Sequence, residues 1–257
     1  MSDRSKIEWT DATWNPVTGC TKVSPACTNC YAERFAERFR GVSGHPYEQG
    51  FSLKLWPDRL KLPLIWKQPR RIFVNSMSDL FHPDITDDFI ERIFDVMIQS
   101  KHHIFQVLTK RSERMLAWIR THFSADSYRS GKQIWPRNIW LGVSVENQNY
   151  TWRIKHLQST PAYLKYLSIE PFLGSISLNT RLLHGIQWVI VGGESGPRAR
   201  PMRPEWVHAI QEECKSNNVA FFFKQWGAYD QSGRRVGKKK AGRNLAGRTW
   251  DSIPLID

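Results

Sequence analysis

Short apolar segments alternate along the chain with longer segments of helical periodicity. Six of the apolar segments have strand length and are rich in β-branched and aromatic residues: Ile72–Asn75, His103–Thr109, Ile139–Val145, Tyr163–Ile169, Trp188–Val191 and Ala220–Phe223. A weaker extended stretch, Thr13–Thr18, comes before them. Between the strands, apolar residues recur at helical spacing, as Phe89, Ile93 and Met97 do in one segment. This alternation predicts a parallel sheet covered by helices, either curved into a barrel or open and doubly wound.

Polar or glycine residues follow nearly every predicted strand at its C-terminal end. These segments are Asn75–Asp79, Thr109–Arg111, Ser144–Asn147, Ser168–Glu170, Gly192–Ser195 and Lys224–Trp226. A barrel gathers such ends around one mouth, where barrel enzymes hold their active sites, whereas an open sheet uses mainly its switch point. Strands also end in polar turn residues for local reasons, so the repetition matters more than any one segment. We therefore predict an α/β fold, a partial (β/α)6 TIM-like barrel with parallel strands and one final strand.

Two stretches do not follow this alternation of strands and helices. Residues 41–71 hold four proline-marked turns and are predicted to form an irregular insert. Residues 227–257 interleave glycines with Lys and Arg, which predicts a basic, loop-rich C-terminal extension. The expected organisation is a barrel over residues 1–226, with the insert at 41–71, followed by the extension.

The charge of the chain indicates a class of partner. Its 257 residues include 37 Lys and Arg against 24 Asp and Glu, a formal net charge of +13. This excess predicts attraction to a polyanion, most simply nucleic acid. No apolar run approaches the roughly 18 residues of a membrane helix, and the polar start lacks the apolar core of a signal peptide. We expect a cytoplasmic protein with no membrane partner, and the sequence leaves the oligomeric state open.

Three of the four cysteines, Cys20, Cys27 and Cys30, share one loop with C-x6-C-x2-C spacing. Three thiolates can hold three irons of a cubic iron–sulfur cluster and leave the fourth iron open to another ligand. A structural zinc ion prefers four protein ligands and would need a further donor, such as His45. A loop without metal is the third possibility. Cys214 lies on the apolar face of a predicted helix and is expected to be a buried, unreactive thiol.

Motifs over nearly the whole chain resemble a known family. The segments that carry the resemblance are Trp14–Cys20, Cys27–Ala32, Asn75–His82, Leu108–Arg111, Leu141–Asn147, Ser168–Phe172, Gly192–Gly196, Phe223–Trp226 and Val236–Lys240. The cysteine loop and the βα units behind it resemble the radical S-adenosylmethionine superfamily. More closely, the chain resembles an uncharacterised phage and prophage protein family with a radical-SAM-like three-cysteine motif.

The resemblance implies a cofactor chemistry. It implies a 4Fe-4S cluster held by Cys20, Cys27 and Cys30, with S-adenosylmethionine bound to the fourth iron. An external electron donor would reduce the cluster, and cleavage of the sulfonium would generate a 5′-deoxyadenosyl radical. The protein would orient the sulfonium and exclude water.

Two positions depart from the superfamily pattern. Its spacing is C-x3-C-x2-C with an aromatic residue before the last cysteine, where this chain has a longer first gap and Asn29. The Gly-Gly-Glu motif expected after the second strand instead follows the sixth. The resemblance nevertheless implies a set of cofactor-binding residues at strand ends, with Tyr31 replacing the missing aromatic residue and a ribose contact at the fourth strand. The predicted set is Tyr31, Ser76, Ser78, Asp79, Ser144, Glu146, Glu170, Gly192, Gly193 and Glu194.

Basic residues near strand ends and in the extension are candidates for phosphate contacts. They are Lys110, Arg111, Arg198, Arg200, Arg203, Lys238, Lys239 and Lys240. A base presented to a radical would have to leave its duplex, which suits a positively charged barrel mouth. The predicted function is a radical enzyme that modifies or repairs a nucleic acid or nucleotide. The alternative is a zinc-stabilised, non-catalytic nucleic-acid-binding protein, and the lysines of the extension could equally form a solvated face.

Overall fold

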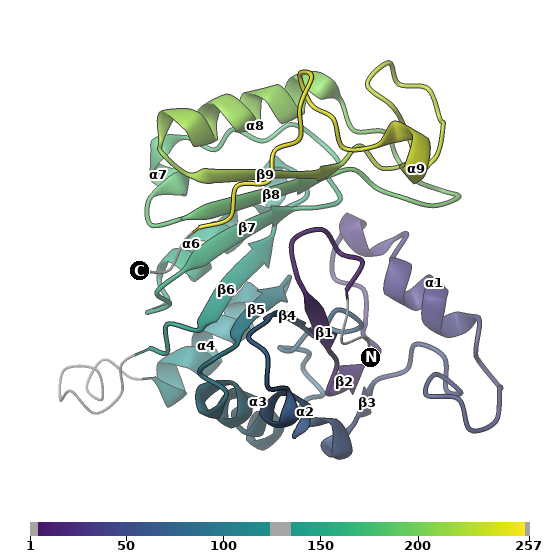
Figure 1. Cartoon of the computed structure of the whole chain (residues 1–257), viewed down its shortest axis with the longest axis vertical. Helices are drawn as coiled ribbons and strands as arrows, with labels where there is room; N and C mark the ends of the chain where they lie inside the picture. The colour runs from purple at the N-terminus through teal and green to yellow at the C-terminus, as the bar shows by residue number, and fades with distance from the viewer. Residues whose placement is uncertain (1–4, 124–134, 255–257) are drawn as a thin grey trace. The chain divides into compact units, whose positions relative to one another are not determined.

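The computed structural model describes residues 5–123 and 135–254 and has an α/β fold (Figure 1). Its larger sheet has seven strands in the order β1-β4-β5-β6-β7-β8-β9. Their bounds are β1 Ala12–Trp14, β4 Arg71–Val74, β5 Ile104–Thr109, β6 Ile139–Ser144, β7 Lys165–Ile169, β8 Trp188–Gly192 and β9 Ala220–Gln225. Neighbours β1 and β4, β4 and β5, β7 and β8, and β8 and β9 pair in parallel. Because the strand order never reverses, the sheet has no switch point, and the partial TIM-like barrel topology is confirmed.

Helices connect the strands, as the alternation predicts. The α-helices are α1 Tyr31–Glu37, α2 Leu62–Ile65, α3 Asp87–Gln99, α4 Ser112–His122, α6 Trp152–Gln158, α7 Thr180–Leu183, α8 Pro204–Ser216 and α9 Lys238–Ala241. Short 3-10 turns are η1 Pro25–Cys27, η2 Pro57–Arg59 and η3 Gln148–Tyr150. The predicted periodicity of α3 is confirmed, since Phe89, Ile93 and Met97 are all buried. Thr86 caps this helix by accepting a hydrogen bond from the Phe89 amide.

The chain divides into two compact units. The first comprises Met1–Val23, Cys30–Leu141 and Thr160–Tyr163. The second comprises Ser24–Asn29, Gly142–Ser159 and Leu164–Asp257. The described parts of each unit are treated separately below.

In the first unit, β1, β4 and β5 are aligned so that Trp14 pairs with Val74 and Val74 with Val107. The predicted single stretch Thr13–Thr18 is wrong in one respect, because it forms two separate strands. The break falls at Asn15 and Pro16, and proline has no amide hydrogen to continue the sheet. After the break, β2 Val17–Thr18 pairs antiparallel with β3 Lys54–Leu55 of the predicted insert.

In the second unit, β7, β8 and β9 form a mostly apolar core in which Leu167 pairs with Val189 and Val189 with Phe221. Helix α8 lies along β9 and turns Val207, Ile210 and Cys214 inward (Figure 1). Continuous burial of this kind is expected of strands covered on both faces.

The predicted basic extension follows β9 within the second unit. Its return toward β9 makes an antiparallel bridge between Phe222 and Asp251, and Phe223 donates its amide hydrogen to the Trp250 carbonyl at 2.9 Å. These contacts cover part of the open edge of β9, where unpaired backbone groups would otherwise attract other strands. Across the described ranges, no helix has both the length and the apolar character needed to cross a lipid bilayer.

Candidate metal centre

The cysteine loop begins at a glycine that its backbone requires. Gly19 has φ +85°, and a Cβ there would lie 2.2 Å from the Ser52 carbonyl oxygen. Its amide donates to the Met77 carbonyl at 3.0 Å, and the Cys20 amide donates to the Phe51 carbonyl at 3.3 Å. A side chain at position 19 would therefore clash with backbone and strain φ, which explains the Gly-Cys pair at the start of the motif.

The three thiols of the loop have suitable chemistry for a metal. Cys20, Cys27 and Cys30 are half-buried and form no disulfide. Cys27 ends the turn η1, and Cys30 is the N-cap residue of α1. In the described part of the chain, no three His, Cys, Asp or Glu side chains are gathered into a ligand set. The donors therefore fit an iron–sulfur cluster or zinc by type, while their role as ligands stays a prediction.

Arg111, which lies just after β5, contacts Cys20, the first cysteine of the loop. Its guanidinium donates from Nη1 to Cys20 Sγ at 3.3 Å and from Nη2 to the carbonyl and hydroxyl oxygens of Thr21, both at 2.9 Å. Arg111 also forms an ion pair with Asp79 at 3.3 Å. Burial alone would lower the pKa of Arg111, but the charges of Asp79 and Cys20 outweigh it and raise that pKa. A cation fixed beside a thiol favours the thiolate that a metal needs.

Asp79 is buried, and both of its carboxylate oxygens accept hydrogen bonds. Its Oδ1 accepts the Thr109 hydroxyl at 2.6 Å and the Phe81 amide at 3.0 Å, while Oδ2 accepts the Lys110 amide at 3.0 Å. These contacts join the end of β4 to the end of β5. In this structure Asp79 therefore supports Arg111 and the cysteine loop, and its predicted contact with a cofactor remains a prediction.

The predicted residues Ser76, Ser78 and Tyr31 contact protein groups of the first unit. Ser76 exchanges hydrogen bonds with the Asn15 carboxamide at 3.2 Å, and Ser78 donates to the Val17 carbonyl at 3.0 Å. The Tyr31 hydroxyl donates to the Ser76 carbonyl at 2.5 Å, and 56% of the Tyr31 residue surface is exposed. Tyr31 therefore contacts Ser76, and the role of these three residues in cofactor binding stays a prediction.

His82 is a buried partner of the cysteine loop and is missing from the predicted site residues. Its Nδ1 accepts the Asp84 amide at 3.2 Å, so Nε2 carries the proton and donates to the Thr21 hydroxyl at 2.9 Å. Burial and the nearby Arg111 charge lower the pKa of His82. A neutral imidazole therefore braces Thr21, next to Cys20.

In the second unit, the Gly-Gly-Glu segment begins at Gly192, the last residue of β8. A Cβ on Gly193 would lie 2.0 Å from the Trp226 carbonyl oxygen, so glycine allows the ends of β8 and β9 to touch. Glu194 then accepts hydrogen bonds from Arg200 and from Asn29 of the cysteine loop. Burial alone would raise the pKa of Glu194, but the hydrogen bonds from Arg200 and Asn29 outweigh it and hold that pKa below its usual value.

Ser144 and Glu146 form a buried polar cluster after β6. Glu146 pairs with Arg153 at 2.8 Å, and both side chains are at least 98% buried. The Ser144 hydroxyl and Glu146 Oε1 have no hydrogen-bond partner among the described residues. Such atoms are costly unless something else satisfies them, which marks this cluster as a polar position open to a further partner.

Glu170, after β7, pairs with Lys224 near the end of β9. Lys224 Nζ lies 2.7 and 2.9 Å from the two carboxylate oxygens of Glu170. Gln225 donates to the Gly193 carbonyl and the Ser195 hydroxyl, each at 3.2 Å. Arg153 and Lys224 are missing from the predicted site residues. The sequence could have indicated Lys224, because it belongs to one of the polar segments at strand ends. It gave no such indication for Arg153, which lies in α6.

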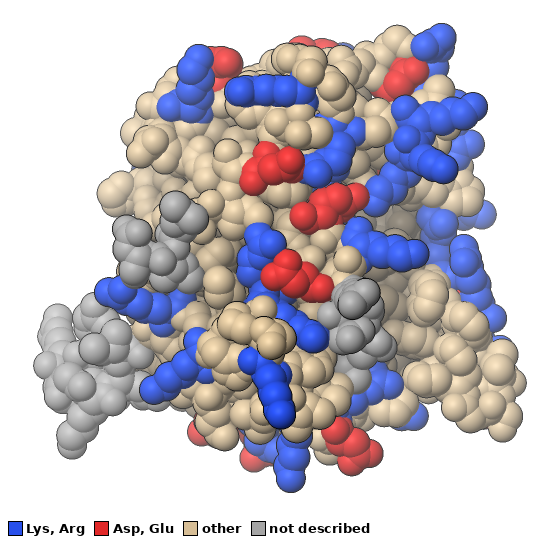
Figure 2. Space-filling model, in the orientation of Figure 1, with Lys and Arg blue, Asp and Glu red and all other residues tan. Residues whose placement is uncertain are grey.

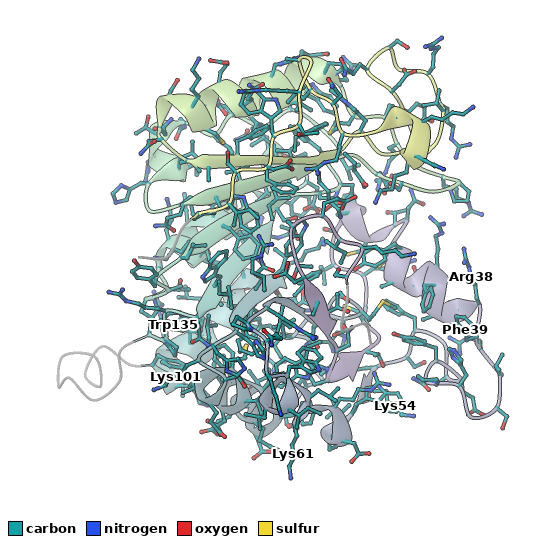
Figure 3. The ribbon with its side chains drawn as sticks, in the orientation of Figure 1. Arg38, Phe39, Lys54, Lys61, Lys101 and Trp135 are labelled. Carbon is teal, nitrogen blue, oxygen red and sulfur yellow. The ribbon has the colours of Figure 1, made fainter. Side chains whose placement is uncertain are left out.

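The predicted phosphate-binding cations fall into two groups. Arg111 and Arg200 are occupied by carboxylates, and Lys110 is half-buried. The exposed group is Arg198, Arg203, Lys238, Lys239 and Lys240. Figure 2 shows basic side chains gathered over α9 and its flanking segments. Elsewhere cations such as Arg38, Lys54, Lys61 and Lys101 stand on separate elements (Figure 3).

Cys214, the fourth cysteine, and His45, the histidine suggested as a zinc ligand, both pack against neighbouring residues. Cys214 is fully buried, as predicted, and burial raises the pKa of its thiol to about 12. His45 stacks on Phe39 at 3.9 Å between ring centroids, and its Nδ1 accepts the Tyr47 amide. His45 therefore has a structural role beside α1, and nothing among its contacts indicates a zinc ligand.

Comparison with known proteins identifies a family. A family model described as "Protein of unknown function (DUF5131)" matches residues 4–254. Curated proteins yield no match. Among solved structures, a spore photoproduct lyase complexed with dinucleoside spore photoproduct is similar with a TM-score of 0.44 and 11% identity. The match covers 84% of this chain and 64% of the lyase chain, so this chain spans less than two thirds of the length of the lyase. A likeness at this TM-score carries no argument about function.

Proposed function

The chain belongs to the DUF5131 family, whose function is unknown, and we propose that it is a radical S-adenosylmethionine-type iron–sulfur enzyme acting on a nucleic acid or nucleotide. The observation that carries the proposal is the cysteine loop. Its three thiols form no disulfide and follow the first strands of a partial barrel, and a cation already contacts the first of them. Cys20, Cys27 and Cys30 would hold a 4Fe-4S cluster. When bound, the cluster and S-adenosylmethionine would supply one-electron cleavage of a sulfonium.

The protein's own residues would prepare the loop for this role. In the first unit, Asp79 fixes Arg111, and Arg111 contacts both the thiol of Cys20 and the backbone of Thr21. The arrangement keeps a positive charge beside a sulfur that must be deprotonated to bind a metal.

The polar cluster after β6 supports binding of a hydroxyl-rich cofactor. Glu146 Oε1 needs a donor and the Ser144 hydroxyl can both donate and accept, and neither has a partner among the described residues. Ribose hydroxyls donate and accept in the same way. Arg153 would orient Glu146, since it donates a hydrogen bond to the other carboxylate oxygen at 2.8 Å.

The exposed lysines of α9 support a polyanionic substrate. Lys238, Lys239 and Lys240 are consecutive and exposed, within a chain of net charge +13. Consecutive exposed cations match the closely spaced charges of a phosphate backbone. Their contacts would supply affinity without reading sequence, leaving recognition of the reacting group to the strand ends.

Anaerobic reconstitution with iron and sulfide tests the proposal. We expect a brown protein with broad absorbance near 400 nm that, once reduced, forms 5′-deoxyadenosine from S-adenosylmethionine. DNA and RNA should be supplied separately, because stimulation by either would identify the substrate class. A colourless protein with one tightly bound zinc and no 5′-deoxyadenosine would overturn the proposal in favour of a zinc-stabilised binding protein.

A further inference from the structure

The Gly-Gly-Glu segment contacts the cysteine loop directly. Glu194 Oε2 accepts hydrogen bonds from the Asn29 carboxamide at 3.1 Å, the Arg200 amide at 2.8 Å and Arg200 Nε at 2.9 Å. Its Oε1 accepts Arg200 Nη2 at 2.6 Å. Both carboxylate oxygens are thus occupied by protein donors. All of these residues lie in the second unit, which includes Ser24–Asn29.

Arg200 also contacts the cysteine loop at Pro25, on the other side of Cys27 from Asn29. Its Nη2 donates to the Pro25 carbonyl at 2.9 Å, while Asn29 also donates to the Arg198 carbonyl at 2.8 Å. The loop is therefore held on both sides of Cys27. The Glu194 side chain is only 5% exposed and that of Arg200 is 35% exposed, so their charge-assisted hydrogen bonds are partly shielded from water.

We infer that Glu194, Arg200 and Asn29 form a positioning clamp that holds residues 25–29 in the conformation that presents Cys27 to a metal. The inference deepens the proposed function and rests on it for the identity of the metal. It also joins the two departures from the superfamily pattern. Asn29 stands where an aromatic residue is expected, and the Gly-Gly-Glu segment follows a different strand, yet the two contact each other. Glu194 is accordingly a positioning residue for the loop.

Alkylation of Cys27 in the metal-free, full-length protein tests the clamp without requiring any cofactor. Iodoacetamide labelling would be followed by peptide mass spectrometry in wild type, Asn29→Ala, Glu194→Gln and Arg200→Gln. Loss of one charge-assisted contact should free the segment and raise the Cys27 labelling rate by about tenfold in the two charge variants, and by a few-fold in Asn29→Ala. Glu213→Gln is the matched control, because the Glu213 carboxylate accepts from the Leu178 amide at 2.8 Å and the Ser177 hydroxyl at 3.3 Å, which lie in the same unit and outside the cysteine loop.

The three variants separate loop ordering from simple electrostatics. A purely electrostatic effect would change the Cys27 labelling rate in opposite directions when the Glu194 charge and the Arg200 charge are removed, and Asn29→Ala would leave that rate unchanged. A clamp instead predicts faster labelling in all three. Opposite changes, or no change in Asn29→Ala, would overturn the inference. Because Asn29→Ala removes no charge, it keeps the test valid if a charge variant fails to fold.

Iron content after reconstitution then links the clamp to the metal. We expect the clamp variants to retain a several-fold smaller iron content per chain than wild type, with Glu213→Gln unchanged. If the wild-type protein binds no iron, the proposed function is wrong. The labelling rates still test the clamp in that case, because they are measured on metal-free protein. If wild type and all clamp variants bind iron equally, the clamp has no role in metal binding.

Discussion

The Asn29 carboxamide lies 3.1 Å from Glu194 Oε2, which connects the cysteine loop to a segment 165 residues later in the chain. The opposite edge of the loop is held by Arg111, which contacts Cys20 at 3.3 Å. Each anchoring arginine is paired with a buried carboxylate, Asp79 for one and Glu194 for the other. The loop thus has two independent supports, one within each unit.

Replacing a cysteine of the loop should abolish metal binding. In Cys27→Ala, iron after anaerobic reconstitution should fall to background, because two thiolates cannot hold a cubic cluster. Iron and sulfide analysis with absorbance near 400 nm provides the measurement. Cys214→Ala is the control and should keep its iron, since Cys214 is buried in α8. Full iron content in Cys27→Ala would contradict the assignment of that ligand.

Cys214 should resist alkylation in the folded protein. Burial raises the pKa of its thiol to about 12, so at pH 8 it is protonated and unreactive. Labelling at Cys214 should be roughly a thousandfold slower than at an ordinary exposed thiol. Peptide mass spectrometry at timed intervals measures this, and unfolding in urea should remove the difference. Fast labelling in the native protein would mean that α8 opens readily.

Removing the Asp79 charge should destabilise the first unit. Asp79→Asn would leave the Arg111 guanidinium without its ion-pair partner and weaken the bonds from Thr109 and Lys110. We expect a loss of about 2–4 kcal/mol in the free energy of unfolding, measured by urea denaturation. Asp95→Asn, on an exposed position of α3, should change it by less than about 0.5 kcal/mol. Equal stability of the two variants would argue against the network.

The lysines of α9 should dominate any binding to DNA. Changing Lys238, Lys239 and Lys240 to Gln should weaken binding and reduce the slope of log affinity against log salt by up to about 2.7. The control changes Lys54, Lys61 and Lys101 to Gln, which removes the same charge from separate elements (Figure 3). Fluorescence anisotropy at several salt concentrations compares the two triple variants. Identical slopes would show that net charge, not the α9 cluster, drives binding.

Much of the fold was predictable because the patterns that encode it are local. Continuous apolar runs such as Trp188–Val191 and helical spacing such as Phe89 and Ile93 depend on near neighbours in the chain. The prediction for Thr13–Thr18 was wrong at Pro16, although the proline itself was a visible signal. The two-stranded sheet of β2 and β3 was not predictable, since it pairs very short segments far apart in the chain.

The amino-acid sequence established the βα alternation, the three-cysteine loop and the net charge, because each is a property of residue type and spacing. Tertiary structure alone revealed that Arg111 lies against Cys20 and that Glu194 and Arg200 hold residues 25–29. Those contacts join residues 91 to 175 positions apart, and spacing along a chain carries no information about such pairs until strands align them. The sequence therefore identified which residues bear the chemistry, and the folded chain determined which of them support one another.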